Sequence, residues 1–271
     1  MMADQAAVVE LQKRASRLRR HVLSIAGAQP CHLGGSMSCA DLMAALFFRF
    51  LRFDASGRAG DHFLLSKGHA VHVYHACLVE LEQVAASELP LSGTVGSRLG
   101  GHPTLRAPGV EVATGSLGHA LSMGIGMALG EALNGTDRRT VVLLGDGELQ
   151  EGTVWEAALS APRFGLPNLI AIVDANEFQA SGAVSNIMPV EPIAEKWRAF
   201  RWNVIEIDGH DMGAVVDALD RMPAGEGPTA IVAHTVKGKG VPGVEGTPRA
   251  HYTKLNPAEV EAALALLEAQ P

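Results

Sequence analysis

The stretch TVVLLGDGELQEGTVWEAALSAPRFGLPNLIAIVDAN, residues 140–176, decides the fold of this chain. It begins with a continuous run of leucine and β-branched residues (140–145), passes through a helical pattern from Thr153, and ends in a second apolar run (168–176). Uninterrupted apolar runs of this length are typical of strands buried on both faces of a parallel sheet. The stretch therefore predicts a strand, a helix and a second buried strand.

Outside this unit, strand and helix patterns keep alternating, which is typical of a parallel sheet covered on both faces. We therefore predict an α/β fold with a mostly parallel sheet and helices on both faces, organised as a single domain over residues 1–271. A short apolar piece at 62–66 receives no assignment. The other predicted elements are strands at 203–208 and 228–236 and helices at about 5–28, 37–51, 67–85, 191–200 and 212–222 and from Pro257 to the end of the chain.

Composition limits the classes of partner and location. The net charge of −7 argues against nucleic acid and anionic membranes as partners. The three cysteines lack the spacing of a zinc site, so we expect free thiols. No hydrophobic N-terminal signal is present, and we expect a cytoplasmic protein. The apolar segment 117–135 is too interrupted to span a bilayer, and its glycines, Gly124, Gly126 and Gly130, suit a buried helix.

Two polar side chains follow the two strands of the opening stretch. Asp146 stands between two glycines after the first strand, and Asn176 follows the second strand. Ligands bind at the carboxyl ends of parallel strands, and a carboxylate with an amide oxygen suits Mg²⁺ or Ca²⁺ bridging to a phosphate. A dinucleotide fingerprint is excluded because position 150 is Gln150 rather than glycine. The alternative is that Asp146 caps a turn and Asn176 occupies a left-handed position, and the spacing leaves both interpretations open.

At this point the sequence resembles the transketolase family. Its GDG, followed at the family's spacing by the asparagine of DAN, is similar to the thiamine diphosphate motif of transketolases. Further resemblances follow in family order along most of the chain. They are LSKGHA (65–70), GGHPT (100–104), TGSLGHALSMGIGMALG (114–130) and KGKGVPGVEGTPRAHYTK (237–254).

The resemblance implies a thiamine-diphosphate-binding fold and a role for each matching residue. Asp146, Asn176 and the backbone carbonyl of Phe178 would bind Mg²⁺ (or Ca²⁺), and Gly147 would contact the diphosphate. The thiazolium of the cofactor would take a two-carbon ketol unit from a ketose and pass it to an aldehyde. The other implied cofactor contacts are His69, Gly115, Ser116, Leu117, Lys237 and His251, and the histidines implied around the substrate are His32, His102 and His251.

The histidines also have simpler explanations. His69, His72 and His75 recur every three residues, so a zinc cluster is an alternative, although only His69 lies in the GH motif. His72 and His75 are expected to be packing or surface residues. His102 lies in a Gly-Gly-His-Pro turn and, without the resemblance, could be a turn residue.

The resemblance also implies a partner. Single-chain members of the family are more than twice as long, and their next domain binds the aminopyrimidine and carries the activating glutamate. We therefore expect a separate C-terminal subunit with this pyrimidine-binding domain, with two copies of each chain. The alternatives are a decarboxylating transfer from a 2-oxo acid, a transferase whose acceptor is not a sugar, and a non-catalytic scaffold subunit.

Three departures from the family pattern put the substrate in question more than the cofactor. CHLGG replaces the more usual GHPGG around His32, and His119 stands where glutamine is common. Tyr252 follows His251 where the family commonly has glycine.

Overall fold

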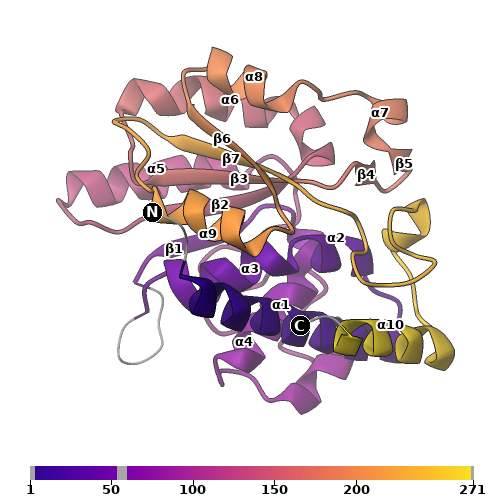
Figure 1. Ribbon diagram of the computed structural model, residues 1–271. Helices are drawn as coiled ribbons and strands as arrows, with labels where there is room; N and C mark the ends of the chain where they lie inside the picture. Colours follow the sequence, from indigo (N-terminus) through magenta and orange to yellow (C-terminus); the bar gives the residue numbers. More distant parts are fainter. Residues whose placement is uncertain (1–3, 54–59, 270–271) are drawn as a thin grey trace.

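Five parallel strands form the central sheet of this protein, in the order β1–β2–β3–β7–β6. The computed structural model describes residues 4–53 and 60–269 (Figure 1). The predicted strand–helix–strand unit is confirmed, because β2 and β3 are neighbours and pair in parallel. The strands are β1 (His62–Leu65), β2 (Thr140–Gly145), β3 (Leu169–Ala175), β6 (Asn203–Asp208) and β7 (Thr229–His234), and a separate hairpin consists of β4 (Phe178–Gln179) and β5 (Gly182–Ala183).

Strand β1 is an element that the sequence pattern left unassigned. It has four residues, all of them buried, and it extends the sheet by pairing with β2 from His62 opposite Thr140. A segment of four residues is too short to show a strand period. Its identity as a strand comes from pairing with a segment nearly eighty residues later in the chain.

Helices cover both faces of the sheet, as predicted (Figure 1). Side chains alternate along β2, so that Val142 and Leu144 pack with one set of helices, and Val141 and Leu143 pack with the other set. The first set is α5 (Ala120–Leu133), α6 (Gly152–Ser160) and α8 (Ile193–Ala199), and the second set includes α1 (Gln5–Ala28), α3 (Ala40–Ala45), α4 (Val71–Glu80), α9 (Met212–Asp220) and α10 (Pro257–Ala269).

One helical prediction differs from the structure, and another is confirmed. The helix predicted at 37–51 is divided into α2 (Leu33–Ser38), α3 and a π-helical segment, Leu46–Phe50. By contrast, α10 begins at Pro257 as predicted, and Asn256 and Glu259 cap it reciprocally through bonds of 3.0 and 2.9 Å. A short helix, α7 (Val184–Ile187), follows the hairpin.

The prediction that α5 is buried around its glycines is only partly correct. A Cβ at Gly124 would lie 2.6 Å from Val142, so this glycine lets the helix approach the sheet closely. Nothing in the described chain lies within 4 Å of a Cβ placed at Gly126 or Gly130. The face of α5 that carries these two glycines therefore has no covering element in the part of the chain that the structure describes.

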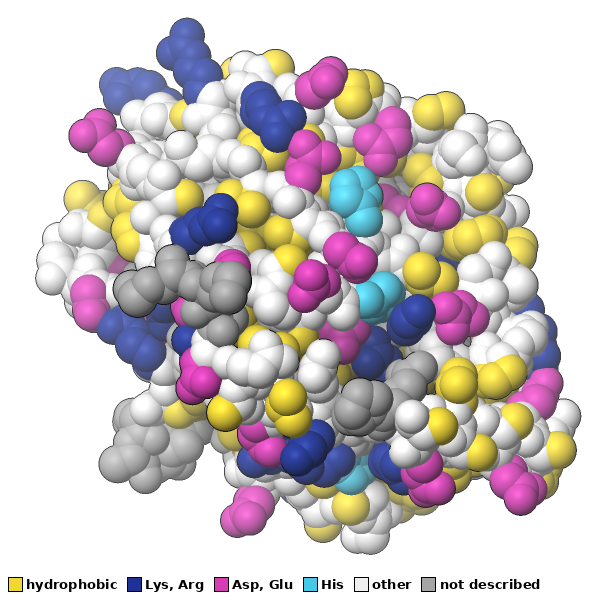
Figure 2. Space-filling view, in the orientation of Figure 1, with side chains coloured by type: hydrophobic (Ala, Val, Ile, Leu, Met, Phe, Trp, Pro, Cys, Tyr) yellow, Lys and Arg dark blue, Asp and Glu magenta, His cyan; other side chains and the backbone are white. Residues whose placement is uncertain are grey.

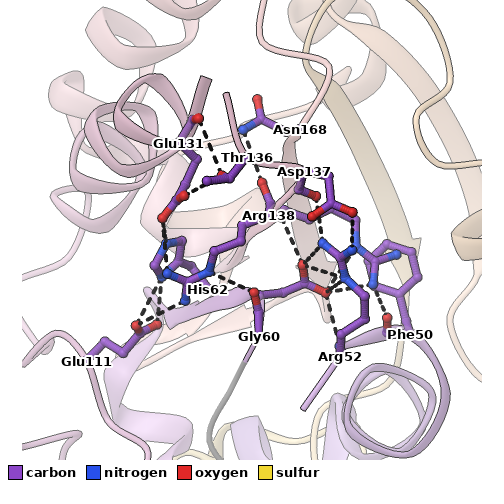
Figure 3. A network of polar contacts seen from close by, with 12 residues as sticks. Phe50, Arg52, Gly60, His62, Glu111, Glu131, Thr136, Asp137, Arg138 and Asn168 are labelled. Atoms are coloured by element: carbon purple, nitrogen blue, oxygen red, sulfur yellow. Dashed lines mark hydrogen bonds and ion pairs between the residues drawn. The ribbon is translucent and has the colours of Figure 1, made fainter. Parts of the chain in front are cut away.

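A dense polar network closes the sheet at the amino ends of β1 and β2 (Figure 3). His62 lies between two carboxylates, with Nδ1 2.9 Å from Glu111 and Nε2 2.8 Å from Glu131. The buried Asp61 carboxylate accepts hydrogen bonds from Arg52 and from Arg139, each through backbone and side chain. These bonds connect the end of the π-helical segment to the first residues of both strands.

The structure bears on some of the expectations drawn from composition. Cys31, Cys39 and Cys77 are free and buried, as predicted. No helix among residues 4–53 and 60–269 is long and apolar enough to cross a membrane. On the face shown in Figure 2, acidic and basic side chains are interspersed. The absence of a nucleic-acid partner stays a prediction.

Candidate active site

A cavity of about 310 Å³ lies at the carboxyl ends of β2 and β3. The two strands end in register, with Gly145 opposite Asp174, so the residues that follow them meet at one edge of the sheet. The expectation that Asp146 and Asn176 follow neighbouring strands is confirmed. The predicted site residues that line the cavity are His69, His102, Gly115, Leu117, Asp146, Gly147, Asn176, Phe178, Lys237 and His251.

Asp146, Asn176 and Phe178 bring a set of hard oxygen atoms to this cavity. Asp146 is only 3% exposed, and its carboxylate accepts the backbone N–H of Gly147 at 2.8 Å and that of Glu177 at 2.5 Å. Burial, together with the charge of Asp174, raises the pKa of Asp146 to about 6. A buried carboxylate that lacks a full counter-charge, beside amide and carbonyl oxygens, fits a divalent cation such as Mg²⁺.

Lys237 contacts one of these oxygens in the structure. Its ammonium donates a hydrogen bond of 2.6 Å to the backbone carbonyl of Phe178. Among the described residues, no group of three or more His, Cys, Asp or Glu side chains could hold a metal ion. The zinc alternative for His69, His72 and His75 therefore finds no support in the described part of the chain.

The turn-residue alternative is half right. Asp146 does cap the short 3₁₀ segment that follows β2, through its bond to Gly147. The residue with a left-handed backbone after β3 is Glu177, with φ of 70°, rather than Asn176. The strained position orients the backbone N–H of Glu177 toward Asp146, and Asn176 keeps its side chain at the cavity.

Four histidines from separate segments surround one side of the cavity. The ring of His32 lies 5.6 Å from that of His69, 5.8 Å from that of His102 and 5.2 Å from that of His251. Two backbone hydrogen bonds of 3.0 Å between Cys31 and Thr253 hold the His32 and His251 segments together. A further ring, Tyr252, lies 4.9 Å from His32. His32 is thus adjacent to the cavity, although it does not line it.

These histidines are held in the neutral form. Burial, followed by the charges of His102 and Lys237, lowers the pKa of His32 to about 4. Burial and Lys237 lower the pKa of His251 to about 4, and burial lowers the pKa of His69 well below its usual value. Burial also lowers the pKa of His102. A neutral imidazole offers one donor and one acceptor, which suits a group that forms hydrogen bonds with a polar ligand near pH 7.

Lys237 fixes the tautomer of one of them. Its ammonium lies 3.2 Å from His251 Nδ1, and an ammonium can only donate, so Nδ1 accepts and Nε2 carries the proton. Burial and the charge of Lys67 lower the pKa of Lys237 to about 8. His251 therefore presents an N–H donor from the nitrogen that Lys237 does not contact.

The backbone comes unusually close to the cavity at two glycines. Gly115 has a φ of 140°, and a Cβ there would lie 3.1 Å from the ring of His102. A Cβ at Gly147 would lie 3.0 Å from Cβ of Gln179. Side chains at these positions would fill the space in which an anionic ligand could approach the backbone.

Three residues in or beneath the cavity were missed from the sequence. Lys67 and Asp174 form an ion pair in which both side chains are fully buried. Glu148, 2% exposed, accepts the backbone N–H groups of Gly118 at 2.8 Å and Gly145 at 3.1 Å, and so holds two cavity segments together. Lys67 lies inside LSKGHA, and Asp174 lies inside DAN. A charged residue within each of these two motifs was the signal in the sequence that could have identified them.

Some predicted residues lie elsewhere. Ser116 is exposed and outside the lining, with its hydroxyl 3.4 Å from His119. His72 and His75 are buried, in agreement with the packing alternative, and both contact the hydroxyl of Ser92, at 3.3 and 3.0 Å. Neither of these two histidines lines the cavity.

Comparisons with known proteins identify the family to which the chain is similar. Residues 12–271 match the family described as "Transketolase, thiamine diphosphate binding domain". One subunit of the apulose-4-phosphate transketolase of Phocaeicola vulgatus is 36% identical over 252 residues, which are 92% of this chain and 89% of that protein. A 6-deoxy-6-sulfo-D-fructose transketolase subunit of a Clostridium species is 36% identical over 266 residues, which are 96% of this chain and 97% of that protein.

A solved structure extends the comparison to the fold. A mutant transketolase from Pichia stipitis superposes with a TM-score of 0.88 at 28% identity. The match covers 97% of this chain but only 41% of that longer one.

Proposed function

The chain belongs to the transketolase family, as its thiamine diphosphate binding domain, and we propose that it is the N-terminal subunit of a two-component, Mg²⁺-dependent transketolase. In this proposal residues 1–271 act as one unit that holds the diphosphate end of the cofactor. The donor is a ketose or ketose phosphate, and the acceptor is an aldehyde. The observation that carries the proposal is that Asp146, Asn176 and Phe178 line one cavity together with the neutral histidines His69, His102 and His251.

In the proposed complex, Asp146, Asn176 and the Phe178 carbonyl hold the cation, and the cation neutralises the diphosphate. Acidic side chains face an anion in this arrangement because a divalent ion lies between them. The buried position of Asp146 strengthens its attraction to the cation, since few water molecules compete for it. Ca²⁺ offers the same preference for oxygen ligands and is the alternative ion.

Bound thiamine diphosphate supplies an electron sink at its thiazolium ring for breaking a carbon–carbon bond beside a carbonyl. The residues of this chain bind the substrate and move protons. His251 donates from Nε2, because Lys237 occupies its other nitrogen. His32 and His102, both neutral and with rings 5.8 Å apart, offer a donor and an acceptor to the hydroxyl and carbonyl oxygens of a sugar.

A C-terminal subunit completes the proposal. The relatives from Phocaeicola vulgatus and the Clostridium species, of which this chain covers 89% and 97%, are named as subunits, whereas the chain spans 41% of the transketolase from Pichia stipitis. The open face of α5 and the end of α6 expose Met123, Leu133 and Leu159, which are 39%, 80% and 67% exposed. Exposed large apolar side chains on neighbouring helices favour a protein interface. We propose that the partner subunit packs here, with two copies of each chain in the assembly.

The test is reconstitution. The purified chain with Mg²⁺ and thiamine diphosphate is expected to show no ketol transfer, and activity is expected once a transketolase-type C-terminal subunit is added. Ketose phosphate and pyruvate are compared as donors, because turnover of pyruvate alone would favour the decarboxylating reaction. Robust activity of the isolated chain would contradict the two-component proposal.

A single substitution tests the histidines in the reconstituted enzyme. His102→Ala removes a donor and acceptor from the cavity, and a general acid or base contributes about 10²- to 10⁴-fold to turnover. The calorimetric affinity for thiamine diphosphate is the matched readout, since a folding defect would lower it together with turnover. An unchanged turnover would remove His102 from the proposed mechanism.

A further inference from the structure

Beneath the cavity lies a buried carboxylate, Asp174, that accepts from several donors. Asp174, at the end of β3, accepts hydrogen bonds from Ser38 at 2.8 Å, Thr235 at 2.6 Å and Asn176 at 2.7 Å, and it also pairs with Lys67. Both members of the Asp174–Lys67 pair are fully buried. A buried carboxylate with four donors is fixed in position and keeps its charge.

One of these four bonds has a consequence for the cavity. An asparagine side chain has a donor end and an acceptor end that are almost the same size, so packing alone does not select its orientation. An ionised carboxylate can only accept, so the amide nitrogen of Asn176 must face Asp174. The oxygen of Asn176 then faces away from Asp174, on the side where the residue lines the cavity, and it accepts one long hydrogen bond of 3.3 Å from the backbone N–H of Phe178. A carbonyl-type oxygen has two lone pairs, so one remains for a ligand.

We propose that Asp174 is a positioning residue, which presents the oxygen of Asn176 to the cation by binding its amide nitrogen. This inference rests on the proposed function, because it assigns a task within the same metal site. It explains why a charged pair is buried beneath the site, where an apolar pair would be less costly to bury. Lys67 keeps Asp174 ionised, and Asp174 sets the orientation of Asn176.

Substitution at position 174 should act through Asn176. In Asp174→Asn, the new amide can donate, so Asn176 is free to turn its oxygen toward it and its nitrogen toward the cavity. The cation then loses one oxygen ligand and meets a donor instead. The affinity of the full chain for Mn²⁺ in the presence of thiamine diphosphate, measured by electron paramagnetic resonance, is expected to fall by about 10- to 100-fold.

The rescue variant separates positioning from general support. In the double variant Asp174→Asn with Asn176→Asp, position 176 carries oxygen at both ends and needs no orientation. It also keeps one carboxylate in the pair, so the charge near Lys67 is conserved. Recovery of most of the lost Mn²⁺ affinity is expected. A merely structural role of Asp174 would not be repaired by a second change at position 176.

Further variants keep the test decisive. Asp174→Asn leaves the Lys67 ammonium buried without a counter-ion. Asp174→Asn, alone and combined with Asn176→Asp, is therefore also measured in a Lys67→Met background. Thr235→Val removes a different donor from Asp174 and should change Mn²⁺ affinity by less than about 3-fold.

The outcomes are distinct. Unchanged affinity in Asp174→Asn, or no recovery in the double variant of either background, would overturn the positioning role while leaving the metal site in place. If the unmodified chain bound no Mn²⁺ with thiamine diphosphate, the proposed function itself would fail. A loss at position 174 that Asn176→Asp repairs is the result expected from the geometry.

Discussion

The two edges of the central sheet shift the pKa values of their polar groups in opposite directions. At the amino edge, hydrogen bonds to Glu111, opposed by burial, raise the pKa of His62, and the Asp61 carboxyl keeps a pKa below its usual range because Arg52 and Arg139 outweigh its burial. At the carboxyl edge, burial lowers the pKa of His251 and raises that of Asp146. The charged forms of the histidine and carboxyl are thus favoured at the amino edge, whereas those of His251 and Asp146 are disfavoured at the cavity.

The difference separates a structural network from a functional site. The amino edge connects segments that are distant in the chain, and its charges are neutralised within the protein (Figure 3). The carboxyl edge holds acceptors and neutral rings whose preferred partners are a cation and a polar ligand. Desolvated groups beside a cavity are typical of binding and catalytic sites, and paired groups are typical of stability.

The largest effect is expected at the carboxyl edge. Asp146→Ala removes the carboxylate proposed to hold the cation, and Mg²⁺-dependent binding of thiamine diphosphate should weaken by at least about 100-fold. The free energy of unfolding of the chain without ligand should change by less than about 1 kcal/mol, because the cost of burying the Asp146 carboxylate opposes the contribution of its hydrogen bonds from Gly147 and Glu177. Calorimetry and urea denaturation measure the two quantities. A large loss of stability with unchanged binding would reverse the roles assigned to the edges.

The matching change at the amino edge should have the opposite pattern. Asp61→Ala removes the acceptor for Arg52 and Arg139, including their backbone N–H groups, and should lower the free energy of unfolding by about 2 to 3 kcal/mol. Calorimetric affinity for thiamine diphosphate should stay within about 3-fold under conditions where the chain is folded. Weakened cofactor binding with normal stability would contradict the comparison.

The pH dependence of stability provides a further test of the difference between the two edges. The pKa of His62 is raised in the folded state, so its contribution is fully present below its unfolded pKa of about 6.5 and is lost as pH rises through the folded pKa. The groups that face it are Glu111, Glu131 and Arg138. The stability difference between the wild type and His62→Gln should therefore be largest below about pH 6.5, with a size of about 1 kcal/mol or less.

A histidine from the other edge is the control for this experiment. The pKa of His251 is lowered to about 4, so this ring is neutral in both folded and unfolded chains above its unfolded pKa. Above about pH 7.5, one unit beyond the unfolded pKa, the stability difference between wild type and His251→Gln should hardly change with pH. A slope there as steep as that of His62 would show that the edges do not differ.

The smallest effect is expected at the rim of the site. Tyr252 is 58% exposed and its ring lies 4.9 Å from His32. Tyr252→Gly should leave stability within about 0.5 kcal/mol and change KM for the acceptor by a few-fold, because it removes one edge-to-face contact. Steady-state kinetics of the reconstituted enzyme with acceptors of different length measures this. Equal KM values for all acceptors would exclude Tyr252 from acceptor selection.

Patterns within a few residues predicted the central part of the fold. The runs at 140–145 and 203–208 became β2 and β6 with the expected bounds, and α1 occupies 5–28, because local periodicity decided each of them. Strand β1 and the division of 37–51 into three helical segments escaped prediction. Both depend on contacts that are remote in the chain, such as the pairing of His62 with Thr140.

The site was predictable where a motif carried its residues, and less so where buried partners support them. Asp146 and Asn176 were found from two strand ends, and the cavity contains both. Asp174 was interpreted as part of a buried strand, because an apolar run does not reveal that one carboxylate collects donors from Lys67, Ser38 and Thr235. Such a network exists only after four separate segments have packed together.

The proposed site depends most directly on a cation between the protein and the diphosphate. Titration calorimetry of thiamine diphosphate into the full chain, once with Mg²⁺ and once with excess chelator, tests this in a single pair of experiments. We predict saturable binding with Mg²⁺ and an affinity at least about 100-fold lower without it. Equal affinity in both conditions, or no binding in either, would contradict the assignment of Asp146, Asn176 and Phe178 as a metal bridge.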